Sequence, residues 1–137
     1  MNEIYKAIRD KLVLELITNA SPDVVKDIYD HVPEDLPDTG YPFLRLDQIQ
    51  ASNNDVDDKS GFIATIQVIG FSRYRGSLEI SNIADSVYNA LHRFDMPDTA
   101  TYGISDIIQS FRSIKTQPDG LTRNAVQQFQ IIFEPLI

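Results

Sequence analysis

Apolar residues recur along this chain at two different periods, and the period assigns each segment to a helix or to a strand. Helical spacing of three and four residues runs from about residue 3 to 19, and again from Ser77 to about Phe94. Ser77 is placed to cap the second helix, and Pro22 ends the first because proline disfavours helical geometry in the residue before it. The pattern therefore predicts two amphipathic helices.

Segments with a period of two, in which apolar and polar positions alternate, are typical of strands half-buried in a sheet. The alternation predicts strands at 41–49, 62–71, 102–115 and 124–133. In 62–71 one face is wholly apolar and the other is mixed, so this strand is expected to be central in a sheet covered on one side. A slip in the alternation at Ile107-Ile108 predicts a β-bulge.

The segments between these elements are polar or rich in proline. Residues 24–42 read as an irregular connector with one short strand at 27–32. Residues 50–61 read as a long polar hairpin loop, and Gln117 to Gly120 as a tight turn. The element order predicts an α+β domain spanning residues 1–137, with an antiparallel β-sheet of mixed strand lengths and two α-helices packed on one face.

Glutamines and isoleucines on the mixed faces predict a surface suited to another subunit rather than to bulk water. The residues assigned to this surface are Gln67, Gln127, Gln128 and Gln130 with Ile63, Ile69 and Ile131.

Composition excludes several classes of chemistry. The chain has no cysteine, which rules out disulfides, thiolate nucleophiles and cysteine-ligated metals. Its formal net charge is −8, from 12 basic and 20 acidic side chains, which argues against autonomous nucleic-acid binding. The whole imbalance lies in residues 23–58, where ten acids face two bases. These carboxylates can serve solubility, or they can line an acidic pocket.

Motifs for catalysis are absent from the sequence. The two histidines, His31 and His92, are isolated, the six glycines are scattered, and there is no Gly-x-Ser-x-Gly. A calcium-binding EF-hand loop beginning at Asn53 would need glycine at its sixth position and glutamate at its twelfth. The sequence has Asp58 and Ala64 there, so this site is rejected. We therefore expect no enzyme activity, no cofactor and no metal. No segment is long and apolar enough for a membrane span or a secretory signal, so we expect a soluble protein made in the cytoplasm.

Four segments of the chain form a recognisable series. They are Ile28-Tyr29-Asp30-His31-Val32-Pro33, Tyr41-Pro42-Phe43-Leu44, the helix at 80–93, and Asp119-Gly120-Leu121-Thr122-Arg123 before the last strand. Together they resemble the tail-completion proteins of long-tailed bacteriophages and prophages, also called tail terminators or tail-to-head joining proteins. The order and spacing of the four segments, which cover nearly the whole chain, carry the resemblance.

The resemblance implies a structural virion protein, located at the head-tail interface and assembled in the bacterial host cytoplasm. Such a protein forms a ring, usually of six copies, at the head-proximal end of the tail tube. The ring ends tube polymerisation and joins the tail to the head connector, or stopper, protein. Its partners are thus other copies of itself, the tube protein and the connector, while DNA only passes through and no membrane is involved. The rival hypothesis is a small soluble ligand-binding domain or enzyme with an acidic pocket built from residues 23–58.

A closed ring needs two complementary patches on each subunit, and polar loops are candidates for such contacts or for lining the channel. The loop at 50–61, the turn at 72–76 and the turn at 117–123 supply the candidate residues. These are Asp55, Asp57, Asp58, Lys59, Arg73, Tyr74, Arg75, Asp119 and Arg123. A channel lined by the carboxylates of Asp55, Asp57 and Asp58 would keep DNA from adhering in transit.

Overall fold

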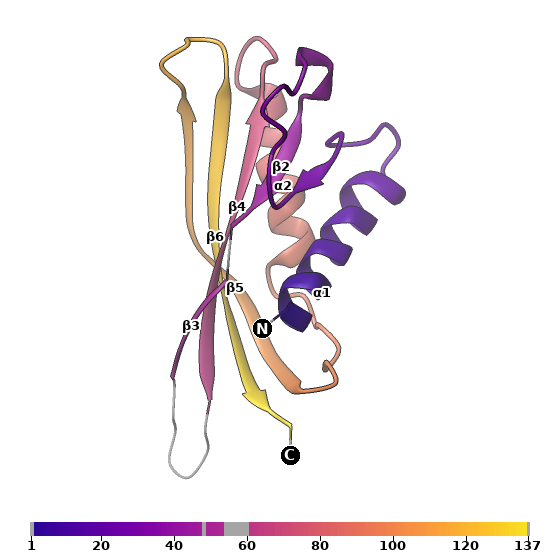
Figure 1. Ribbon diagram of the computed structural model, residues 1–137, viewed down its shortest axis with the longest axis vertical. Coiled ribbons are helices and arrows are strands. Elements are labelled where there is room, and N and C mark those ends of the chain that lie inside the picture. The colour runs from indigo at the N-terminus through magenta and orange to yellow at the C-terminus, as the bar shows by residue number, and fades with distance from the viewer. Residues whose placement is uncertain (1, 48, 54–60, 137) are drawn as a thin grey trace.

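A computed structural model describes residues 2–47, 49–53 and 61–136. In it, a six-stranded sheet is covered on one face by two helices (Figure 1). The helices are α1 (Asn2–Val13), which continues as the π-helical η1 (Leu14–Thr18), and α2 (Leu78–Leu91), with a short 3-10 helix η2 (Asp38–Gly40). The strands are β1 (Ile28–Tyr29), β2 (Phe43–Leu46), β3 (Gln50–Asn53), β4 (Phe62–Ser72), β5 (Tyr102–Thr116) and β6 (Arg123–Pro135). The α+β class and both helices predicted from the sequence are confirmed.

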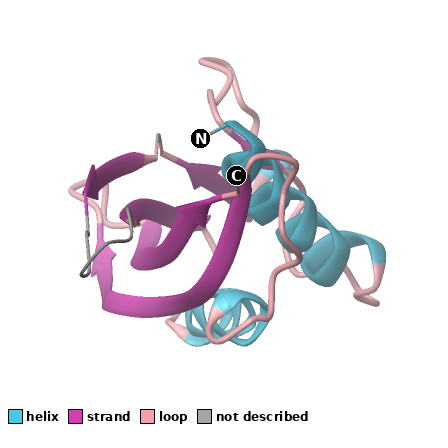
Figure 2. Cartoon of the chain, turned by 90° about the horizontal axis from the view of Figure 1, so that it is seen from below, coloured by secondary structure: helices cyan, strands magenta, loops and turns pink. Residues whose placement is uncertain are grey.

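The strands are ordered β1-β2-β4-β6-β5, and β3 pairs with β4 beyond the end of β2. Strand β4 is central, as predicted, and pairs with β6 along its whole length, from Phe62↔Phe133 to Ser72↔Arg123. In Figure 2 the strands curl round, and both helices lie outside the curl.

One strand pair corrects the expected antiparallel sheet. Strands β1 and β2 are parallel, with Ile28 beside Leu44, so the sheet is mixed. Parallel neighbours need a crossover connection, and the irregular segment 30–42 provides it by carrying the chain back before β2 begins.

The core lies between the sheet and the helices. Strand β4 contributes Ala64, Ile66 and Val68, and β6 contributes Ala125, Phe129 and Ile131. These pack on the buried stripes of α1 and α2 as one cluster. The period-two alternation in both strands is therefore the signature of a face that the helices cover.

The mixed surface proposed from the sequence is wrong for three of its residues, because Ile69, Gln127 and Ile131 are buried. Gln127 and Ile131 alternate with Phe129 on the helix-covered face. The Gln127 Nε2 atom donates hydrogen bonds of 2.8 Å to the Ala84 carbonyl oxygen and of 2.8 Å to Gln109 Oε1. An amide can be buried here because these partners satisfy it.

Several element boundaries differ from the sequence prediction. The strand expected at 41–49 is limited to β2, and β3 occupies the start of the expected loop at 50–61. The lower half of β4 extends past β2 and leaves a hydrogen-bonding edge, which β3 takes although its residues are polar. The predicted bulge at 107–108 is replaced by two register shifts on either side of it, at Ile104/Asp106 and Gln109/Phe111. The second helix ends at Leu91 rather than near Phe94, and Ser77 occupies the N-cap position without a side-chain capping bond.

Candidate functional site

Three loops meet at one end of the sheet, at the top of Figure 1. They are the turn after β4, the turn between β5 and β6, and the segment around η2. We call this the loop end. It gathers five of the sequence-predicted site residues, which are Arg73, Tyr74, Arg75, Asp119 and Arg123. The other four, Asp55, Asp57, Asp58 and Lys59, lie outside the described residues, as does most of the rejected calcium loop.

The β5–β6 turn is held by the carboxylate of Asp119. Its Oδ1 accepts hydrogen bonds from the backbone N–H groups of Leu121 (2.9 Å) and Thr122 (2.8 Å), and its Oδ2 accepts one from Thr122 Oγ1 (2.7 Å). Gly120 takes a positive φ of 72°, which the turn requires. The N–H donors of Thr122 and Leu121, followed by the Thr122 hydroxyl, stabilise the charged form and hold the pKa of Asp119 below its ordinary value.

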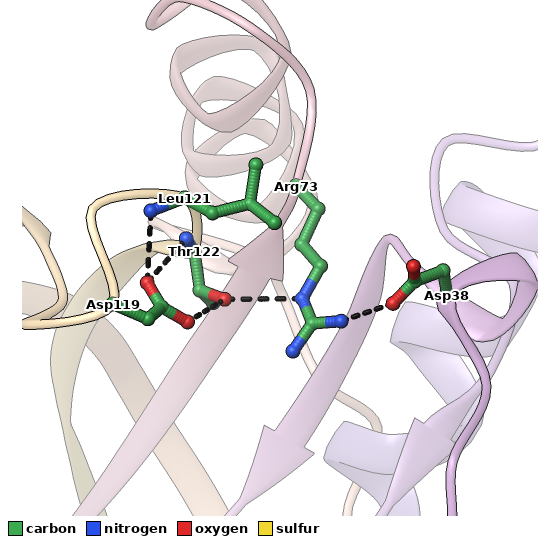
Figure 3. A network of polar contacts seen from close by, with 5 residues as sticks. All are labelled: Asp38, Arg73, Asp119, Leu121 and Thr122. Atoms are coloured by element: carbon green, nitrogen blue, oxygen red, sulfur yellow. Dashed lines mark hydrogen bonds and ion pairs between the residues drawn. The ribbon is translucent and has the colours of Figure 1, made fainter.

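Arg73 joins this turn to the segment around η2, as Figure 3 shows. Its Nε donates to Thr122 Oγ1 at 3.1 Å, and its Nη1 is hydrogen-bonded and ion-paired to Asp38. Its guanidinium also lies over the Tyr41 ring, 4.4 Å from the ring centroid. The Thr122 hydroxyl thus accepts from Arg73 while donating to Asp119, and one polar chain connects three segments.

Arg123 adds a second connection between the turns, because its Nη1 donates to the Tyr74 carbonyl oxygen at 3.2 Å. Arg75 differs from these residues. It is exposed on the turn after β4, and among the described residues it has no hydrogen bond or ion pair.

Beneath Arg73, four aromatic rings form a small second cluster on the sheet face that the helices leave uncovered. Phe43 is buried at its centre, with ring centroids 4.8 Å from Phe71, 4.9 Å from Tyr41 and 5.6 Å from Tyr29. Tyr29 and Tyr41 belong to the segments that carry the family resemblance, but their sequence positions did not predict this cluster. The rings come from Tyr29 in β1, from Tyr41 just before β2 and Phe43 at its start, and from Phe71 near the end of β4, so the available signal was the recurrence of aromatic residues near strand ends.

The surface of the loop end is apolar at three points. Tyr74, Leu78 and Leu121 are 55%, 66% and 47% exposed. Two open hollows adjoin them, one of about 350 Å³ lined by Pro22, Tyr74 and Leu78, and one of about 420 Å³ lined by Tyr41, Arg73 and Leu121. Tyr74 and Glu79 line both hollows, and Glu79 accepts a 2.6 Å hydrogen bond from the buried Ser72 hydroxyl. Exposed apolar groups on a rigid framework are typical of a surface that docks another macromolecule.

The carboxylates of the acidic segment do not converge in the described structure. Asp23, Asp38 and Asp47 each line a different hollow. Within the described ranges, no group of three or more His, Asp and Glu side chains could hold a metal ion. None of the described helices is both long and apolar enough to cross a membrane.

The fold and the loop end together define a small α+β protein in which hydrogen-bonded turns at one end of the sheet carry exposed apolar side chains. Comparison with known proteins gives that class an identity. Residues 3–134 match the family described as "Tail completion protein gp17", so the chain belongs to this family. This membership makes it a structural protein of a phage tail, within a phage-type virion, and confirms the resemblance seen in the sequence.

A solved structure with the same fold is a chain in the "Virion of native gene transfer agent (GTA) particle". The two share 14% sequence identity with a TM-score of 0.80, over 97% of this chain and 96% of that chain. A comparison with curated protein sequences gives no significant match.

Proposed function

We propose that this chain is a tail terminator, which forms a ring of six copies at the head-proximal end of the tail tube. The ring ends tube polymerisation and joins the tail to the head connector. The observation that carries this proposal is the match to a tail completion family over residues 3–134, nearly the whole chain. The loop end supports it, since a structural joining protein needs a rigid docking surface.

In this proposal the loop end is the surface that meets a neighbouring ring along the tail axis. Tyr74, Leu78 and Leu121 provide exposed apolar contact area, and they are spaced over three segments that Arg73 and Asp119 lock together. Such preorganisation lowers the entropic cost of docking. The opposite end of the ring would lack these contacts, so one end binds the tube protein and the other meets the connector.

The chain acts in this proposal without catalysis. Its activity is to bind, to stop addition of further tube rings and to leave a passage for DNA. Carboxylates facing that passage, including Asp55, Asp57 and Asp58, would repel the phosphate backbone and keep the genome moving.

The test is genetic and physical together. Deleting the gene from the phage or phage-like element that encodes it should give abnormally long tails and heads without tails, measured by electron microscopy. Purified chain added to tube protein during polymerisation should shorten the tubes and appear at one end of each. Normal particles after deletion would rule out the terminator function.

A further inference from the structure

Strand β5 has one long edge with no partner among the strands that the structure describes. It is paired with β6 alone over Tyr102–Thr116. The register shifts leave the edge irregular near Ser105 and Ser110, and the stretch from Phe111 to Thr116 is regular after them. An exposed, regular edge presents unpaired backbone N–H and C=O groups and is a template for another strand.

Two large apolar side chains on this stretch are exposed, on opposite faces of the sheet. Phe111, opposite Gln128, is 51% exposed, and Ile114, opposite Ala125, is 41% exposed. A groove or a helix would cover only one of these faces. An added strand would place neighbours beside both.

The other edge of the sheet, at the same level, is β1. The residues Ile28 and Ile114 stand at the two ends of one row across five strands, through Leu44, Gly70 and Ala125. Strand β1 is also paired with one described strand alone. On its other side the Ile28 carbonyl oxygen accepts a 3.4 Å hydrogen bond from Arg9 Nη2, and the Ile28 N–H donates a 2.7 Å bond to Asp27 Oδ1, so an added strand would replace these two side-chain bonds. The residues that flank β1, Asp27 and Asp30, are both exposed.

We propose that β5 of one copy pairs with β1 of the next copy, so that the sheet continues from subunit to subunit. This rests on the proposed function, because it names the lateral contact of the ring. The two edges differ, so the contact is heterologous and closes by repetition around a rotation axis.

Strand direction agrees with this pairing. Three neighbouring pairs, β5–β6, β6–β4 and β4–β2, are antiparallel, and the pair β2–β1 is parallel. Three reversals of direction across the sheet leave β1 running opposite to β5. A rotation about an axis along the strands preserves direction. The joined strands are therefore antiparallel, which is the more stable pairing.

Charge agrees as well. Residues 107–117 contain two bases, Arg112 and Lys115, and no acid, whereas residues 21–38 contain six acids and one base. One antiparallel register sets Lys115 opposite Asp27 and Arg112 opposite Asp30, the two residues that flank β1. Arg112 is ion-paired to Asp85 at 2.9 Å within its own subunit, so the pair of Lys115 and Asp27 carries the charge argument. Opposite charges directly across a sheet stabilise the pairing.

The same register sets Ile114 opposite Ile28. Both residues lie on the helix-covered face of their own sheets, since they belong to one row. The side-chain alternation thus continues unbroken across the contact. A register shifted by one residue would put apolar positions on the wrong face and lose both charge pairs.

Disulfide trapping tests this contact, and the chain suits it because it has no cysteine of its own. The proposed register sets Thr116 opposite Lys26, and both are exposed. When T116C and K26C proteins are mixed and oxidised, we expect a linked heterodimer. Neither protein alone should form one. The control is S105C mixed with K26C, which has an exposed cysteine on the same strand away from the contact.

Three outcomes overturn the proposal. They are no heterodimer above the control at the highest soluble concentration, self-linking of T116C that matches or exceeds the mixture, and equal linking of S105C. Self-linking would indicate an isologous contact between two β5 edges.

Charge reversal gives a second test. K115E, introduced into both cysteine variants, should reduce trapping to the control level, because Glu then faces Asp27 across the contact. The double variant K115E/D27K should recover trapping, because the two opposed charges are then exchanged and attract again. The Asp27 Oδ1 atom accepts a 2.7 Å bond from the backbone N–H of Ile28, so circular dichroism must show that D27K is folded. The control K6E reverses another exposed charge, on α1, where Lys6 is ion-paired to Asp10, and should leave trapping unchanged. No recovery by a folded double variant contradicts the register.

The two proposals fail separately. Long tails after gene deletion with no trapped heterodimer would leave the terminator function standing and remove this contact. A trapped heterodimer with normal tails after gene deletion would leave this contact standing and remove the terminator function.

Discussion

Arg73 and Thr122 are 49 residues apart in sequence, and the guanidinium Nε of Arg73 donates a 3.1 Å hydrogen bond to the Thr122 hydroxyl. Thr122 is buried, so the bond is shielded from water on one side. It connects the turn after β4 to the turn between β5 and β6. We expect the arrangement of the two turns to depend on this connection.

Removing the Arg73 side chain should therefore loosen the loop end. R73A loses the Thr122 bond, the pair with Asp38 and the contact with the Tyr41 ring. We expect a loss of about 1–2 kcal/mol of unfolding free energy, mostly from the Thr122 bond, because Asp38 is highly exposed. Urea denaturation measures it. The control R75A, on the same turn, should stay within about 0.5 kcal/mol of the native chain.

The Asp119 carboxylate should make stability depend on pH. Its pKa is lower in the folded protein than in the unfolded chain, so its contribution is fully present above the unfolded value of about 3.9. The contribution is lost as the pH falls through the folded value, because the protonated form loses the hydrogen bonds to the charged oxygens.

Thermal denaturation across acidic pH checks this prediction. The variant D119A should melt below the native chain at neutral pH, and the difference should shrink as the pH drops below about 4. A difference that is constant across that range would mean that Asp119 acts through turn geometry and not through its charge. The control D98A removes another exposed aspartate.

The buried amide of Gln127 should matter more than that of its neighbour Gln128. Q127A leaves the Ala84 carbonyl and Gln109 Oε1 without their donor and opens a space beneath α2. We expect a cost of about 2–4 kcal/mol. Q128A, on the uncovered face, should cost less than about 0.5 kcal/mol. Equal effects in urea denaturation would contradict the assignment of faces.

Gln127 also shows how far the sequence could predict this structure. The alternation in β6 places residue 127 on the same face as Phe129, and that pattern is local. The residue type of Gln127 nevertheless favoured the outer surface, and that prediction is wrong. Burial of an amide depends on partners from α2 and β5, and no local pattern reveals them.

The loop end likewise has one part that the sequence could predict and another that it could not. The Asp119-Gly120 turn was predictable, because its hydrogen bonds span three residues. The pairing of Arg73 with Asp38 and Thr122 joins residues 35 and 49 positions apart, so it depends on how the sheet is assembled. Strand β3 was missed for a related reason. Its polar residues form a strand because β4 offers an edge, and not because of their own propensity.

The exposed apolar residues of the loop end should be needed for docking and not for folding. Tyr74 and Leu121 lie on separate turns, and each exposes about half of its surface. The double variant Y74S/L121S should keep its melting temperature, since exposed side chains contribute little to stability. It should nevertheless lose association with tube ends by tenfold or more, because apolar anchors carry much of the free energy of a docked interface.

Cosedimentation with preformed tubes measures the association. The matched control is L14S, which removes a similarly exposed leucine from η1, outside the three loops of the loop end. Equal binding by the native chain and by Y74S/L121S would exclude the loop end as the docking surface, and loss of binding by L14S would place that surface on the helical side of the molecule.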